Sequence, residues 1–82
     1  MSIKVCVKYF AQLKDEADCS EEDIELIDGA DSALLYAKVS EKHRFSLEKN
    51  DLRVAINGQF GQFTTPLKER DVVAFIPPVS GG

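Results

Sequence analysis

The sequence predicts an α+β domain in which one mixed β-sheet carries one main helix across one face. Three observations support this fold class: apolar and polar residues alternate over residues 3–9, a capped helix is indicated from residue 32, and residues 72–76 form a continuous apolar run. Alternation is typical of a half-buried strand, and a short continuous apolar run is typical of a central one. The order of strands around one helix favours an α+β domain with two layers, the sheet and the helix packed on it.

The N-terminal half supplies two strands and the helix. Residues 3–9 form the first strand, residues 10–23 a connection with room for a short helical turn, and residues 24–27 a second strand that ends at Asp28-Gly29. Asp31 or Ser32 is the expected N-cap, because either side chain can accept a hydrogen bond from the first helical turn. The helix runs to about His43, and its apolar stripe is expected to consist of Leu34, Leu35 and Val39.

The C-terminal half supplies three further strands. Residues 52–56 form the third, Asn57-Gly58 is a hairpin signal, residues 59–63 return as a short strand, and residues 72–76 form the last, with Asp71 closing the turn before it. A single helix cannot cover all the large apolar side chains of this chain, so an exposed apolar patch is expected. Its candidates are Phe10, Phe60, Phe63, Phe75 and Ile76. Alternatively, the segment around Phe60 and Phe63 folds back over the core as a lid.

Composition limits the function classes. The 82 residues suffice for one domain, residues 1–82, and the net charge of −4 without a basic cluster argues against nucleic acid as a ligand. No apolar run approaches the roughly 20 residues of a membrane-spanning helix, and the chain starts on a strand pattern instead of a signal peptide. We therefore expect a cytoplasmic protein without a membrane or nucleic-acid partner.

The cysteines and the histidine offer no chemistry by sequence spacing. Cys6 and Cys19 are separated too widely for a zinc motif, and no CxxC occurs. Cys6 fits a strand position, and both cysteines are expected to be free thiols. His43 is expected near the helix C-terminus, where its side chain would interact favourably with the helix dipole. No metal site and no catalytic triad are therefore predicted.

The C-terminal segment Pro77-Pro78-Val79-Ser80-Gly81-Gly82 is the most informative part of the sequence. Proline has a fixed φ and cannot continue a sheet ladder, so residues 77–82 are expected to project as a tail. Two glycines have no Cβ and fit a channel too narrow for other residues. The Gly82 carboxylate is then the candidate reactive group, and since a carboxylate must be activated first, a partner that uses ATP is implied. The alternative is an inert, frayed terminus.

Several segments resemble one known family. The element order with a terminal Gly-Gly is that of the ubiquitin-like β-grasp sulfur carriers. Residues 73–82, Val-Ala-Phe-Ile-Pro-Pro-Val-Ser-Gly-Gly, closely resemble the C-terminus of the molybdopterin synthase small subunits within that family. The segments Tyr9-Phe10-Ala11-Gln12-Leu13 and Val54-Ala55-Ile56-Asn57 are also similar, so the match spans the whole chain, while residues 14–23 and 32–44 carry no matching motif.

The resemblance implies a role in molybdenum cofactor biosynthesis. A ubiquitin-activating-like enzyme would adenylate Gly82 with ATP, and a sulfurtransferase would convert it to a thiocarboxylate. The tail, with Gly81, Ser80, Val79 and Pro78, would then enter the large catalytic subunit, which passes the sulfur to cyclic pyranopterin monophosphate. The family's apolar docking surface corresponds to Phe10, Phe60 and Ile76, next to Phe75. A heterotetramer of two small and two large subunits is implied, with no cofactor bound by this chain.

Other assignments share the fold and the Gly-Gly. Sulfur carriers for thiamine, for tRNA thiolation or for cysteine synthesis use the same activation chemistry, a ubiquitin-like modifier forms isopeptide bonds instead, and a plain interaction domain would have an inert terminus. The chain length and Phe75-Ile76-Pro77-Pro78-Val79 favour the molybdopterin branch.

Overall fold

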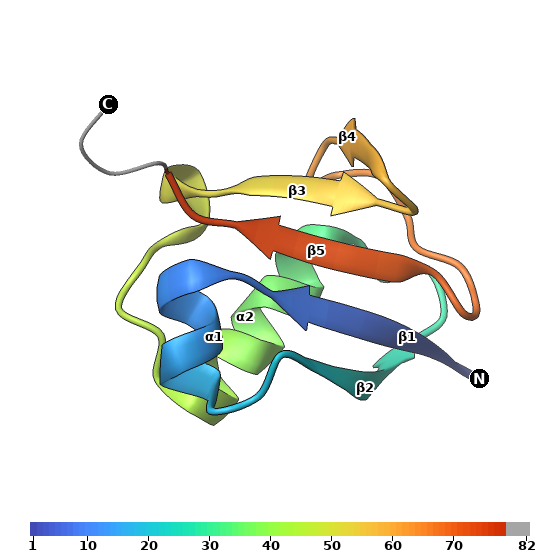
Figure 1. Ribbon diagram of the computed structural model, residues 1–82. Helices are drawn as coiled ribbons and strands as arrows, with labels where there is room; N and C mark the ends of the chain where they lie inside the picture. The colour runs from blue at the N-terminus through green and yellow to red at the C-terminus, as the bar shows by residue number, and fades with distance from the viewer. Residues whose placement is uncertain (79–82) are drawn as a thin grey trace.

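A computed structural model describes residues 1–78 of the chain. Within this part, five strands form one mixed sheet in the order β2-β1-β5-β3-β4, and one main helix lies across one face of it (Figure 1), which confirms the predicted fold class. The strands are β1 (Ser2–Tyr9), β2 (Glu21–Ile27), β3 (Arg53–Ile56), β4 (Gln59–Gly61) and β5 (Val72–Ile76), and the helices are α1 (Ala11–Ala17), α2 (Ser32–His43) and a 3₁₀ turn, η1 (Lys49–Asp51).

The last strand lies in the middle of the sheet, as its continuous apolar run predicted. β5 pairs in parallel with β1, where Tyr9 is opposite Phe75, and antiparallel with β3, where Arg53 is opposite Ile76. Because β1 and β5 run in the same direction, they end at the same side of the sheet. The residue after β1 and the segment after β5 therefore leave the sheet close to one another.

The main helix begins and ends where the sequence indicated. Asp31 is the N-cap, and its carboxylate accepts a hydrogen bond of 2.9 Å from the backbone N–H of Leu34. Leu35 and Val39 are buried as predicted, but Leu34 is 44% exposed, so its place in the apolar stripe was wrong. Tyr36 is buried instead, because it follows Leu35 on the side of the helix that faces the sheet.

The connection after β1 is more ordered than the sequence indicated. Residues Ala11–Ala17 form the helix α1, whose Leu13 and Ala17 are buried. The acidic stretch that follows is also shorter than expected, because β2 already begins at Glu21 and pairs antiparallel with β1 from there. Alternation within β2 places its acidic residues outward and Ile24 and Leu26 in the core.

The predicted hairpin is confirmed. Asn57 and Gly58 have φ values of 53° and 86°, the positive pair that a tight two-residue hairpin requires, and a Cβ at Gly58 would be strained there. Asp71 closes the turn before β5 as predicted, since its carboxylate accepts hydrogen bonds from the Lys68 backbone N–H at 2.8 Å and from the Asn57 side-chain amide at 2.9 Å.

The core lies between the sheet and α2, and one cluster includes side chains from β1, β2, β3, β5, α1 and α2. Within residues 1–78, neither helix is long and apolar enough to cross a membrane. The buried core residues are Ile3, Val5, Val7, Tyr9, Leu13, Ala17, Ile24, Leu26, Ala30, Leu35, Tyr36, Val39, Leu52, Val54, Leu67, Val73 and Phe75. Among the elements of residues 1–78, no helix lies over the opposite face of the sheet (Figure 1).

Candidate functional site

The C-terminal segment leaves the sheet from its central strand. β5 ends at Ile76, Pro77 is buried, and Pro78 is exposed. The expectation that the projecting tail starts at residue 77 is therefore corrected by one residue, because Pro77 packs with the domain. The predicted roles of Val79, Ser80, Gly81 and Gly82 lie outside the described residues.

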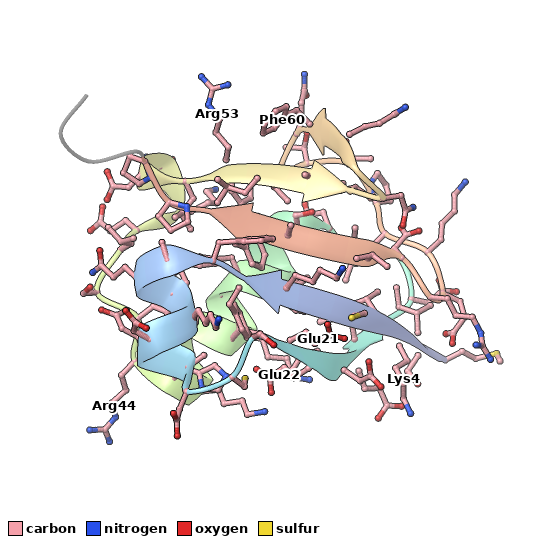
Figure 2. All side chains as sticks on the ribbon, in the orientation of Figure 1. Lys4, Glu21, Glu22, Arg44, Arg53 and Phe60 are labelled. Carbon is pink, nitrogen blue, oxygen red and sulfur yellow. The ribbon has the colours of Figure 1, made fainter. Side chains whose placement is uncertain are left out.

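On the uncovered face of the sheet, apolar side chains form a row from the edge strand β4 across β3 to β5. Phe60 of β4 is opposite Ala55 of β3, and Ala55 is opposite Ala74 of β5. The Phe60 side chain is 68% exposed, and the Arg53 guanidinium lies 5.9 Å from the centre of its ring, a cation–π contact. Both side chains project from the same edge of the molecule (Figure 2). Arginine is enriched among the residues that contribute most to protein–protein binding.

A groove of 330 Å³ connects Phe60 with the start of the tail. Because Phe60 and Pro78 share its wall, a protein that binds over Phe60 would also contact the residues from which the tail departs. The groove is lined by Asn50, Asp51, Leu52, Arg53, Phe60, Ile76, Pro77 and Pro78. We call the surface formed by Phe10, Arg53, Phe60, Ile76 and Pro78 the docking face.

Phe10 lies at the same end of the sheet. It follows directly on Tyr9, which pairs with Phe75, and its backbone is still extended, with φ −130° and ψ 150°. Since side chains alternate along an extended chain, Phe10 points away from the core side that Tyr9 occupies. Its side chain is 46% exposed, and Ile76 is half-buried. The structure thus leaves these two side chains accessible, and their docking role stays a prediction.

Phe75 does not belong to the docking face. Its side chain is 0% exposed, and its ring contacts Tyr36 edge-on at 5.0 Å between centroids, so its assignment to a partner surface was wrong. The reason is the period of the strand: Phe75 and Val73 face α2, whereas Ile76 and Ala74 face away.

The lid alternative holds for only one of its two aromatics. Phe63 is half-buried and its ring stacks on Phe75, with 6.2 Å between centroids and 8° between planes. Phe60, three residues earlier, is on the open face of the sheet instead. The segment after β4 therefore covers the core with Phe63 and leaves Phe60 free to bind a partner.

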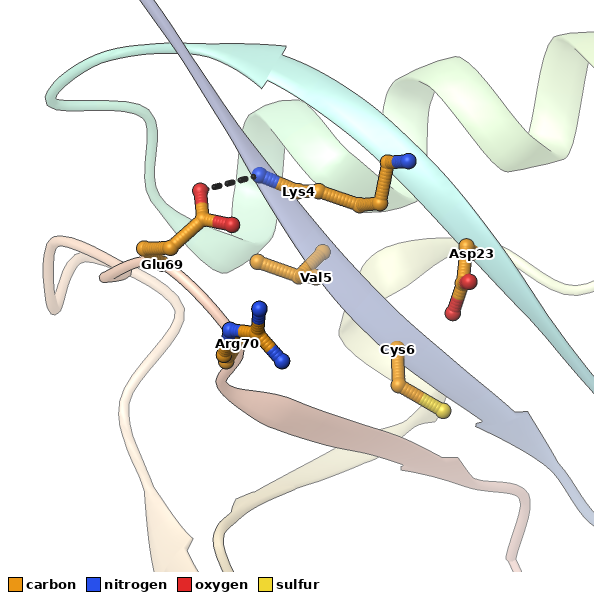
Figure 3. Close-up of a pocket in the computed structure, with 6 residues that line it drawn as sticks. All are labelled: Lys4, Val5, Cys6, Asp23, Glu69 and Arg70. Atoms are coloured by element: carbon orange, nitrogen blue, oxygen red, sulfur yellow. Dashed lines mark hydrogen bonds between the residues drawn. The ribbon is translucent and has the colours of Figure 1, made fainter.

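The other end of the open face has a polar hollow that contains Cys6 (Figure 3). Here the Glu69 carboxylate accepts a hydrogen bond of 2.9 Å from the backbone N–H of Lys4, which fastens the loop before β5 to β1. Burial raises the pKa of the Cys6 thiol, and the neighbouring carboxylates of Glu21 and Asp23 raise it further. Cys6 is therefore a protonated thiol at neutral pH and a poor nucleophile.

A polar cluster that sequence spacing did not predict lies around Glu22 of β2. Its carboxylate accepts hydrogen bonds from the Tyr9 hydroxyl and from the Lys42 ammonium, both at 2.6 Å, and is 2.5 Å from His43 Nε2. Cys19, Glu22 and His43 each offer a ligand atom, and these atoms lie within 4.8 Å of one another. No metal site was predicted on His43, because no second candidate group lies near it in the sequence. The fold brings Cys19 and Glu22 beside it, since β2 and the end of α2 meet only in the folded chain.

The ionised state of Glu22 is strongly favoured. Partial burial alone would raise the pKa of this carboxyl, but the hydrogen bonds from Lys42, Tyr9 and His43 outweigh burial and lower it from 4.5 to about 2. In the same cluster, burial raises the pKa of the Cys19 thiol, and the Glu22 charge raises it further. Burial and the bond to Glu22 also raise the pKa of Tyr9, so its hydroxyl stays a donor.

We expect the folded chain to lose stability as the pH falls from about 4.5 towards 2. The unfolded chain takes up a proton at Glu22 near pH 4.5, whereas the folded chain does so only near pH 2. The stabilisation is therefore complete above pH 4.5 and is lost between these values. Glu22→Gln should remove this part of the acid limb and lower stability at neutral pH by about 1.5–3 kcal/mol, the net value of a hydrogen bond to a charged group.

Urea unfolding at a series of pH values, with EDTA present, measures both effects. Asp23→Asn is the matched control, because Asp23 is the exposed neighbour of Glu22 on the same strand and should keep the acid limb of the unsubstituted chain. The same pH dependence in Glu22→Gln and in the unsubstituted chain would contradict the prediction.

The sequence matches a protein-family model and curated relatives over nearly its full length, and two of these relatives are described below. The model describes the ThiS family and matches residues 7–82. The chain is 38% identical to the "Molybdopterin synthase sulfur carrier subunit" of Chlamydomonas reinhardtii, with 100% of both chains covered. It is 33% identical to the protein of the same name from Mycobacterium tuberculosis, with 98% of this chain and 99% of the relative covered.

Solved structures give the same result. A putative molybdopterin converting factor, subunit 1, from Pyrococcus furiosus is 35% identical, with a TM-score of 0.82 over 94% of this chain and 99% of that one. A complex of subunits 1 and 2 of molybdopterin-converting factor from Helicobacter pylori contains a chain that is 30% identical, with a TM-score of 0.64 over 98% and 100%. A ubiquitin from Caldiarchaeum subterraneum, 16% identical with a TM-score of 0.69 over 100% of both chains, shows that the fold is ubiquitin-like.

Proposed function

Because the chain belongs to the ThiS family, we propose that it is the sulfur carrier subunit of a molybdopterin synthase. The observation that carries this proposal is its end-to-end similarity to proteins of that name. The docking face supports it, because Phe60 is exposed and lines the same groove as Pro78, the last described residue before the Gly-Gly end of the sequence.

The group that carries sulfur is the Gly82 carboxylate. In the first step a carboxylate oxygen attacks the α-phosphorus of ATP, so that an acyl adenylate forms and pyrophosphate leaves. In the second step a persulfide-type sulfur donor on a sulfurtransferase attacks the acyl carbon, and AMP leaves. Reductive cleavage of the resulting acyl disulfide by a thiol yields the thiocarboxylate. Because these steps consume ATP, we propose a cytoplasmic location.

The described residues of this chain bind and position, and the partner supplies the reaction pocket. The docking face binds the large subunit. Pro78, at the edge of this face, is the point from which the chain would enter that subunit's active site. There the thiocarboxylate sulfur passes to cyclic pyranopterin monophosphate and helps to build the dithiolene. The two-subunit complex from Helicobacter pylori supports such a partner, and two small plus two large subunits are the expected assembly.

The cysteines are unsuited to carry the sulfur themselves. Burial and nearby carboxylates raise the pKa of both Cys6 and Cys19, so each is a thiol and not a thiolate at neutral pH. Sulfur transfer by a cysteine proceeds through the thiolate. This argues against the cysteines and in favour of the terminal carboxylate as the sulfur-carrying group.

We expect sulfur to be installed only at the C-terminus. Incubation with the activating enzyme, ATP and a sulfur source should exchange one oxygen of Gly82 for sulfur, and tandem mass spectrometry of the intact chain locates the change. The Cys6→Ser, Cys19→Ser double variant should accept sulfur equally well. The thiocarboxylated chain, added to the large subunit and cyclic pyranopterin monophosphate, should yield molybdopterin.

Three kinds of outcome would contradict the proposal. A mass change on Cys6 or Cys19, or loss of sulfur delivery in the folded double variant, would mean that the tail is not the carrier. Isopeptide-linked adducts in cell extract without any molybdopterin formation would identify a protein modifier. Delivery of sulfur to thiamine, tRNA or cysteine synthesis but not to the pterin would place the chain in a sibling pathway.

A further inference from the structure

We propose that Cys19, Glu22 and His43 together bind one divalent transition-metal ion of the zinc type. Cys19 comes from the turn between α1 and β2, Glu22 from β2 and His43 from the last turn of α2. One thiolate, one imidazole and one carboxylate form a ligand set that suits Zn²⁺, with the fourth position left to water. Such an ion would link three segments that are far apart in the sequence.

The present distances require only a small rearrangement. Ligand atoms about 2.0–2.3 Å from a tetrahedral zinc ion are roughly 3.5 Å apart. In the structure the three ligand atoms lie within 4.8 Å of one another, and the contact between His43 and Glu22 is 2.5 Å. An entering ion would therefore separate His43 from Glu22 by about 1 Å and draw the Cys19 sulfur inwards, movements that side chains can supply without a change in the backbone.

Groups around the cluster hold two of its ligands in place. The His43 ring packs edge-on against Tyr9, with 5.6 Å between centroids, and stacks on Phe45, with 5.4 Å. The Tyr9 hydroxyl donates to a Glu22 carboxylate oxygen at 2.6 Å, and His43 contacts the same oxygen. The bond from Tyr9 can persist when the ion takes the place of His43 at that oxygen. Outer hydrogen bonds of this kind orient ligands and raise metal affinity.

The charges of the cluster allow a cation to enter. The Glu22 carboxylate would face the ion, and the Cys19 thiol would lose its proton to the buffer as the sulfur–metal bond forms, so two anionic ligands would surround it. Lys42 opposes it, because its ammonium is 2.6 Å from the other carboxylate oxygen of Glu22. The Lys42 side chain is 53% exposed, however, and can turn towards water. The side chains of Glu22 and His43 are 16% and 13% exposed, so the cluster is reachable from solvent.

The cluster is separate from the docking face. It lies at β2, one edge of the sheet, whereas Phe60 is on β4, the other edge (Figure 2). A metal at this place would fasten the α1–β2 turn to the end of α2, at the opposite edge of the sheet from Phe60. Its presence or absence can therefore be tested independently of sulfur transfer.

Titration of the EDTA-treated, phosphine-reduced full chain with Co²⁺ tests the site. We expect saturation at one ion per chain, with a sulfur-to-cobalt charge-transfer band in the near ultraviolet and shifted His43 ring signals when Zn²⁺ is added instead. Cys19→Ser should abolish the band and weaken binding by at least about 10-fold. Cys6→Ser is the matched control, since Cys6 lies beside Glu21 but outside the cluster, and should leave both unchanged.

A charge variant adds a test in the opposite direction. Lys42→Gln removes the competing cation and should tighten Zn²⁺ binding about 2–5-fold, the size of one exposed charge interaction. Lys38→Gln, one turn earlier on α2 and bonded to the Glu25 carbonyl, is the matched control without effect. Circular dichroism establishes that each variant is folded. No saturable binding, equal binding by Cys19→Ser, or weaker binding by Lys42→Gln would overturn the proposal and leave the cluster as a hydrogen-bond network.

Discussion

A Gly81→Val chain is expected to bind the large subunit almost normally and to deliver sulfur about 100-fold more slowly. Binding survives because the docking face lies before residue 79 and is unchanged. Delivery fails because valine adds a β-branched side chain that restricts φ and χ1 and widens the segment. A displacement of about 1 Å at the reacting atom can cost on the order of 100-fold in rate.

Two assays separate activation from transfer. Adenylation of Gly81→Val by the activating enzyme tests the first channel that the tail must enter, and synthase turnover with chemically thiocarboxylated Gly81→Val tests the second. Ser80→Ala is the matched control, because it changes the neighbouring tail residue without adding a branch at Cβ, and it should retain most activity. Unchanged rates for Gly81→Val in both assays would show that the tail is not recognised by its width.

The elements predicted correctly are those with local signals. Asp31 and the spacing of Leu35 and Val39 were enough to define α2, and Asn57-Gly58 was enough to define the hairpin, because each signal is a property of a few adjacent residues. α1 was indicated only as a possible turn. It is seven residues long, and only Leu13 and Ala17 are buried, so its apolar pattern is too short to be distinguished from a loop.

The face of a continuous apolar strand could not be predicted from the sequence. Phe75 and Ile76 are adjacent and equally apolar, and only the packing of α2 decides that Phe75 is in the core and Ile76 on the open face. The cluster of Cys19, Glu22 and His43 is a stronger example of the same limit. His43 is separated from Glu22 by 21 positions, and no spacing rule connects a β-strand residue to the last turn of a later helix.

Phe60→Glu is expected to weaken association with the large subunit by a few kcal/mol while the free chain stays folded. The structure explains both parts. Phe60 is 68% exposed on a three-residue edge strand, so the isolated domain loses little when it is replaced. In the complex a carboxylate at this place would lose its hydration at an apolar contact, and a central aromatic anchor would be missing.

Arg53 increases the expected effect. Its guanidinium lies 5.9 Å from the Phe60 ring, so a glutamate at position 60 can pair with it in the free chain, and docking would then have to break that pair. Gln59→Glu is the matched control, since Gln59 is the exposed neighbour on β4 and adds the same charge to the opposite face of the strand. Calorimetry of each variant with the large subunit, together with thermal unfolding of the free chains, measures both quantities. If Phe60→Glu binds as tightly as Gln59→Glu, the partner docks elsewhere. If it unfolds the free chain instead, Phe60 contributes to the core in a way that its exposure does not indicate.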